Sequence, residues 1–220
     1  MEMKHNIYFH IPKTGGNTVW SAISGKQFTD IERSESCTID DVTWHKVHFG
    51  FPNLDLINKC NSSGGTLVIS LRDPATHLVS FYNMIRIGHI NTPDERVSAL
   101  PLLWNWTWEE NNLEQYIKLE LLETVYSFGG LRLRHILPYL CLQDINHIKI
   151  LNQESLDTDI RTKLGIDKFQ SENVTAENAK KYAGFQLAKL DTLEDESKIK
   201  LYKFLEKDYY WYNLFQEEFK

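Results

Sequence analysis

The segment Ile11–Thr18 gathers residue types that bind anions into one short loop. It reads Ile-Pro-Lys-Thr-Gly-Gly-Asn-Thr, between the apolar run Ile7–Phe9 and a helix predicted over Val19–Ile23. Glycines let backbone N–H groups approach an oxyanion, and a helix N-terminus adds partial positive charge. The lysine would add a full charge and the two threonines would add hydroxyl donors. The predicted anion contacts are Lys13, Thr14, Gly15, Gly16, Asn17 and Thr18.

The order of these residues differs from that of the Walker loop of nucleotide triphosphatases. In the Walker loop the lysine follows the second glycine and precedes a Ser or Thr that binds magnesium. Here Lys13 precedes both glycines. The nearby pair Gly25-Lys26 is followed by Gln27, and Trp20 stands where the first Walker glycine belongs. The sequence therefore predicts no Walker site.

A second basic residue follows a second predicted strand. Thr66–Leu71 is a short apolar run rich in β-branched residues, which is typical of a buried parallel strand. Asp73 suits a helix N-cap and Pro74 suits the first helical position, so a helix is predicted over Ala75–Ile87. Arg72 then lies at the carboxyl end of a strand, where open α/β sheets bind their ligands.

Together, these two motifs resemble those of sulfotransferases that use 3′-phosphoadenosine 5′-phosphosulfate (PAPS). The Lys-Thr-Gly-Gly order resembles their 5′-phosphosulfate loop, and Leu71–Pro74 followed by Ser80 resembles their 3′-phosphate motif. The resemblance implies that Arg72 and Ser80 hold the 3′-phosphate. It also implies that Lys13 neutralises the charge developing on the 5′-phosphate that leaves. An arginine suits such a role because its planar group bonds two phosphate oxygens at once.

A histidine between the two motifs is the candidate general base. His10–Gly16 and Trp44–Phe51 are similar to segments of the carbohydrate sulfotransferase branch that includes the heparan sulfate 2-O- and 6-O-enzymes. That branch often has a Gly-His-aromatic segment here, whereas Val47 precedes the histidine in this chain. The resemblance implies that His48 is the base, and an ordinary pKa of about 6.5 suits the role. His45 is the alternative, and His10 is expected to order the loop through hydrogen bonds.

The resemblance extends over nearly the whole chain and implies one α/β domain, residues 1–220. Its fold would be P-loop-like and three-layered, with a central parallel sheet flanked by helices. A strand over Ile148–Leu151, a helix ending near Gly165 and an aromatic-rich helix over roughly Asp195–Phe219 are predicted. Residues 91–128 are predicted to be an acceptor-side insert. Its tryptophans either pack on the core or line the acceptor pocket: Trp104, Trp106 and Trp108.

The pair Arg132 and Arg134, which follows Gly129-Gly130, is open to two interpretations. Glycines before a basic helix start could approach the adenine or the 3′-phosphate of the cofactor. Equally, the two arginines could be solvated or paired with acidic side chains.

Composition limits the partners. The chain has 24 Lys and Arg against 30 Asp and Glu, a formal charge of −6, which disfavours nucleic acid and a long polyanionic acceptor. No run approaches the roughly 20 apolar residues of a membrane span, and the first strand begins near Met1. We therefore expect no membrane segment, no signal peptide and a cytoplasmic location. The three cysteines match no zinc spacing, and no metal is expected.

The sequence thus predicts an enzyme that moves the sulfuryl group of PAPS to a hydroxyl or amine of a small-molecule or carbohydrate acceptor. The product of the cofactor would be adenosine 3′,5′-bisphosphate (PAP). Two alternatives belong to other classes, namely a kinase-like nucleotide-binding protein and a non-catalytic module that binds PAP. The oligomeric state is left open by the pattern.

Overall fold

The computed structural model describes residues 3–26, 35–48, 51–91, 113–118, 122–123, 132–169 and 187–219. The chain divides into two compact units. The first comprises 1–72, 133–172 and 210–220, and the second comprises 73–132 and 173–209. Each unit has a hydrophobic cluster of its own among the described residues.

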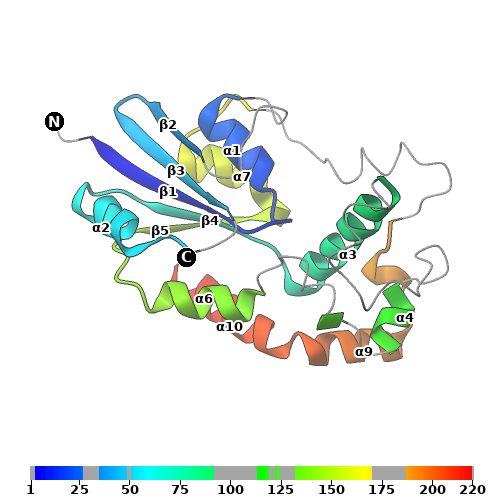
Figure 1. Ribbon diagram of the computed structural model, residues 1–220. Helices are drawn as coiled ribbons and strands as arrows, with labels where there is room; N and C mark the ends of the chain where they lie inside the picture. Colours follow the sequence, from blue (N-terminus) through cyan, green and yellow to red (C-terminus); the bar gives the residue numbers. More distant parts are fainter. Residues whose placement is uncertain are drawn as a thin grey trace. The chain divides into compact units, whose positions relative to one another are not determined.

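The first unit is built on a five-stranded sheet with the order β2-β3-β1-β4-β5 (Figure 1). Four neighbouring strands run parallel and β2 lies antiparallel at one edge. The predicted α/β class with a mainly parallel sheet is therefore confirmed. The strands predicted over Thr66–Leu71 and Ile148–Leu151 are confirmed as well. The strands are β1 (Lys4–His10), β2 (Glu35–Ile39), β3 (Val42–His48), β4 (Leu67–Leu71) and β5 (Ile148–Asn152).

The edge hairpin of β2 and β3 was not predicted from the sequence. Asp40 and Asp41 join the two strands with φ angles of 47° and 63°. Two successive residues with positive φ form the kind of tight turn that matches the twist of antiparallel strands. The segment 42–48, which contains His45 and His48, therefore forms the second strand of the hairpin and pairs with β1.

Helices cover both faces of the sheet in this unit (Figure 1). Tyr8 faces α1, where its ring lies 6.4 Å from that of Trp20, whereas the next residue, Phe9, faces the opposite side. There Phe51, just before α2, packs between Phe9 and Tyr139 of α6. The helical segments are α1 (Gly16–Ser24), α2 (Leu54–Ser62), α6 (Leu133–Cys141), η4 (Gln153–Ser155), α7 (Leu156–Asp159) and η5 (Ile160–Leu164).

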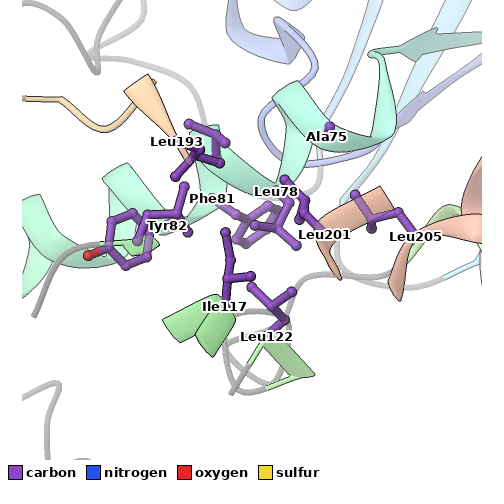
Figure 2. Packing of buried hydrophobic residues seen from close by; sticks show 11 residues of the cluster. Ala75, Leu78, Phe81, Tyr82, Ile117, Leu122, Leu193, Leu201 and Leu205 are labelled. Atoms are coloured by element: carbon purple, nitrogen blue, oxygen red, sulfur yellow. The ribbon is translucent and has the colours of Figure 1, made fainter. Parts of the chain in front are cut away.

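The second unit is helical in its described residues, and Figure 2 shows its core. Most of the buried side chains come from α3, α4 and α9, including Leu78, Ile117 and Leu201. Asp73 caps α3 as predicted, since its Oδ1 accepts the N–H of Thr76 at 2.9 Å. The elements are α3 (Pro74–Asn91), α4 (Leu113–Lys118), η6 (Leu190–Thr192), α9 (Asp195–Phe204) and the start of α10 (Glu206–Glu218).

The single C-terminal helix predicted over Asp195–Phe219 is wrong, because the chain forms two helices that meet at Leu205. The cause is a side chain inserted into the backbone ladder. The Phe204 carbonyl accepts a hydrogen bond from the Arg132 guanidinium at 3.1 Å, and Asp208 binds the same group.

The predicted insert lies mostly outside the described residues. Of segment 91–128, the structure describes Asn91, α4 and the pair Leu122-Glu123. Trp104, Trp106 and Trp108 lie outside the described residues, so both interpretations of them stay predictions. No helix in the described part of the chain is long and apolar enough to cross a membrane.

Candidate anion-binding site

The two predicted cationic residues lie at the topological switch point of the sheet. From β1 the chain passes to β2 and then β3 on one side, and from β4 it passes to β5 on the other. Because β1 and β4 are parallel neighbours, their carboxyl ends meet there. Lys13 follows β1 and Arg72 follows β4. Open α/β sheets bind ligands in the crevice formed at such a point.

The segment Lys13–Thr18, called the anion loop below, has an unusual backbone. Lys13 has a φ of 70° and Gly15 a φ of 84°, whereas Thr14 between them keeps a negative φ. Backbone of alternating hand turns successive N–H groups toward a common point and forms an anion-binding concavity. The left-handed region costs a residue other than glycine about 1–2 kcal/mol, so other contacts must hold Lys13 in it.

Arg72 supplies one contact that holds the loop. Its Nη1 donates to the Lys13 carbonyl oxygen at 3.2 Å, so the guanidinium lies against the strained residue. Both side chains are half-buried. Burial first, and then the positive charge of Arg72, lower the pKa of Lys13 to about 8. An anion bound between the two cations would offset both effects, because opposite charge favours the protonated lysine.

The two glycines of the loop are required by close packing. A Cβ on Gly16 would overlap the His10 imidazole, and one on Gly15 would overlap the Leu156 side chain. His10 is buried, and its ring stacks on that of Tyr8 at 5.9 Å. The His10 ring thus packs against the loop backbone, whereas the hydrogen bonds by which it was expected to order the loop stay a prediction.

We expect Gly16→Ala to lower the free energy of unfolding by about 1–3 kcal/mol, the usual cost of overpacking a filled site. The added methyl group has to displace the buried His10 ring. Urea denaturation measures the loss. In a His10→Ala background the same substitution should cost almost nothing, because the overlapping ring is gone. Equal losses in both backgrounds would contradict the packing account.

Helix α1 opens at Gly16, three residues earlier than predicted, which brings its N-terminus into the anion loop. Its N-cap Gly15 provides no side-chain cap, and the first turn carries no acidic residue. By helix geometry, the first N–H groups of α1 have no partner within the helix. Asn17 is half-buried and Thr18 is buried in this turn. The first turn therefore presents backbone donors where an anion is predicted.

The Thr14 side chain points into the protein. It is fully buried, and its hydroxyl donates to the Ile11 carbonyl oxygen at 2.7 Å. The hydroxyl also lies 2.8 Å from the hydroxyl of Ser70, the next-to-last residue of β4. Sequence reasoning missed Ser70, although a serine within an apolar strand is a usable signal, because a buried hydroxyl needs a partner.

The histidines differ in position along β3. His48 ends the strand directly opposite His10 in the register with β1, and its side chain lies outside the described residues. His45 lies three residues earlier, and its Nε2 is 3.1 Å from Nδ1 of His5. Burial and the neighbouring His5 and Lys59 lower the pKa of His45. The register thus gives His48, not His45, the place at the carboxyl edge.

Two further predicted contacts belong to the second unit. Ser80 lies in α3 and is buried there, so its role beside Arg72 stays a prediction. Arg132 is 2% exposed and is bound by Asp208 and Glu123, with the Phe204 ring 4.2 Å from its guanidinium. The contacts of Arg132 correspond to the ion-pair interpretation of this residue.

Within the described ranges, no group of three or more His, Cys, Asp or Glu side chains could hold a metal ion. Comparisons of the chain with models of protein families, with curated proteins and with solved structures gave no match.

Proposed function

We propose that the chain is a PAPS-dependent sulfotransferase with the P-loop-like sulfotransferase fold. One observation carries the proposal: Lys13 and Arg72 converge on a strained, glycine-rich loop at the switch point of a mainly parallel sheet. The site combines two half-buried cations, backbone N–H donors from a loop whose φ angles alternate in sign, and a helix N-terminus. These features suit a nucleotide that carries several negative charges. The proposed acceptor is a small molecule or a carbohydrate, and the proposed location is the cytoplasm.

The residues of the site fit the demands of sulfuryl transfer. PAPS would supply the sulfuryl group, joined through one oxygen to a 5′-phosphate that leaves. Lys13 would neutralise the charge gained by that oxygen, and the N–H groups of the anion loop would hold the phosphate oxygens. His48 would accept the proton that the acceptor hydroxyl or amine loses as its new bond to sulfur forms.

Binding of PAP tests the proposal, and we expect Arg72→Ala to weaken it about 10- to 100-fold. A hydrogen bond to a charged group contributes about 1.5–3 kcal/mol, and Arg72 also steadies the Lys13 backbone. Arg72→Lys should lie in between, because it keeps the charge and loses the planar fork. Calorimetric titration gives the dissociation constants. The matched control is Arg161→Ala, which removes an exposed arginine of η5 in the same unit. Equal affinity in Arg72→Ala and the control would contradict the proposal.

We expect His48→Ala to lower turnover about 10²- to 10⁴-fold and to leave PAP affinity unchanged. General-base catalysis contributes rate of this order and acts on the acceptor rather than on the bound nucleotide. The release of PAP from PAPS, measured with a panel of hydroxyl and amine acceptors, reports turnover. His135→Ala, at an exposed position of α6, is the control. Normal rates in His48→Ala would assign the base elsewhere, or to no histidine. Tight PAP binding without transfer by the unmodified chain would favour the non-catalytic alternative.

A further inference from the structure

Three buried hydroxyl groups form a continuous chain beneath the anion loop. Tyr8 OH lies 3.0 Å from Ser70 Oγ, and Ser70 Oγ lies 2.8 Å from Thr14 Oγ1. All three residues are fully buried. Tyr8 belongs to β1 and Ser70 to β4, the two strands that flank the switch point. The three hydroxyls therefore connect β1 and β4 to the anion loop that follows β1.

The direction of this chain follows from counting protons. A hydroxyl carries one proton, and Thr14 gives its proton to the Ile11 carbonyl oxygen, which can only accept. Ser70 must therefore donate to Thr14, and Tyr8 must donate to Ser70. Burial raises the pKa of Tyr8 above its usual range, so the phenol keeps the proton that it donates. Every hydroxyl proton of the chain is then used inside the protein.

We infer that Ser70 and Tyr8 are positioning residues for the anion loop, and that Thr14 contacts the 5′-phosphate through its backbone N–H rather than its hydroxyl. The inference rests on the proposed function. Thr14 lies between Lys13 and Gly15, the two residues with left-handed backbone. Fixing its side chain beneath the loop fixes the alternating backbone that presents the N–H groups. A network of this kind is stronger than its separate bonds, because each bond polarises the next.

The test compares two ligands in Ser70→Ala, which leaves Thr14 without its donor and Tyr8 without its acceptor. We expect PAP affinity to fall about tenfold, the effect of losing one buried hydrogen bond. Affinity for adenosine 3′-monophosphate, which lacks the 5′-phosphate, should stay unchanged. A merely structural role of Ser70 would not distinguish the two ligands. The control is Ser21→Ala in α1. The Ser21 hydroxyl is buried, does not belong to the row of three hydroxyls, and has no hydrogen-bond partner in the described structure.

Tyr8→Phe provides a second variant, which removes only the Tyr8 hydroxyl, the one furthest from the anion loop in the row of three. We expect about a threefold loss of PAP affinity, because Ser70 keeps its bond to Thr14. Unchanged PAP affinity in both variants would overturn the inference, and so would equal losses for the two ligands in Ser70→Ala.

Amide hydrogen exchange without ligand separates this inference from the proposed function. In Ser70→Ala the N–H groups of Thr14 and Gly15 should exchange faster than in the unmodified chain and in Ser21→Ala, because the hydroxyl chain no longer holds the loop. Faster exchange, combined with no PAP binding by the unmodified chain, would overturn the proposed function and support the positioning role. Unchanged exchange would overturn the positioning role whatever the ligand.

Discussion

Replacing Lys13 with alanine is expected to lower turnover about 10²- to 10³-fold, the usual effect of losing one preorganised group that stabilises transition-state charge. The lysine lies in the anion loop with a φ of 70°, next to the guanidinium of Arg72. Like lysine, alanine has a Cβ atom, so the backbone strain at position 13 is comparable in the variant and in the unmodified protein. Release of PAP from PAPS measures the effect, with Lys59→Ala on the exposed side of α2 as the control. Retained turnover would contradict the proposed role.

The affinity for PAP is expected to depend on pH through Lys13. Burial and Arg72 lower the pKa of Lys13 to about 8, so the free protein loses this charge as the pH rises through that value. A bound phosphate favours the charged form, so PAP affinity should be nearly constant below about pH 7 and fall as the pH rises through about 8. Lys13→Arg keeps its charge over this range and should remove the decline. A decline of equal size in Lys13→Arg would assign the titration to another group.

The largest loss of stability is expected from Arg132→Met, about 3–5 kcal/mol in the free energy of unfolding. Arg132 and Asp208 have side chains 2% exposed each and are joined at 2.5 Å. Removing the cation takes away the positive charge that Arg132 holds 2.5 Å from the buried Asp208 carboxylate. Urea denaturation measures the loss, and Arg134→Ala should change stability by less than about 0.5 kcal/mol. The double variant Arg132→Met with Asp208→Leu should recover most of the loss, because both charges of the buried pair are then removed.

The Arg132→Met variant also separates the two interpretations of Arg132. If the guanidinium of Arg132 binds Asp208, Glu123 and the Phe204 carbonyl and does not contact the cofactor, the PAP affinity of the folded Arg132→Met variant stays unchanged. A large loss of PAP affinity in a folded variant would instead favour a cofactor contact.

Local chemistry made part of the fold predictable. The β-branched run before Arg72 forms β4, and Asp73 caps the following helix with its side chain. Gly165 ends η5 with a φ of 72°, the left-handed conformation that a glycine at the end of a helix predicts. In each case the cause lies within a few residues of the effect, so the sequence pattern contains it.

Contacts distant in the sequence account for what was missed. The break at Leu205 depends on Arg132, which lies 72 residues before the Phe204 carbonyl that it binds. The buried direction of the Thr14 hydroxyl depends on Ser70, 56 residues away. Residue types predict that the anion loop binds phosphate, but the backbone conformation of the loop and the contacts of its Thr14 hydroxyl depend on these distant partners.

The most direct test of the account is calorimetric titration of the unmodified chain with PAP, beside a titration with ATP and magnesium. The account predicts tight binding of PAP that weakens in Arg72→Ala and weak or no binding of ATP, because the loop lacks the Walker order of lysine and glycines. Magnesium-dependent binding of ATP would favour the kinase-like alternative. Binding of neither nucleotide would contradict the claim that the loop from Lys13 to Thr18, together with Arg72, is the phosphate site of a sulfotransferase.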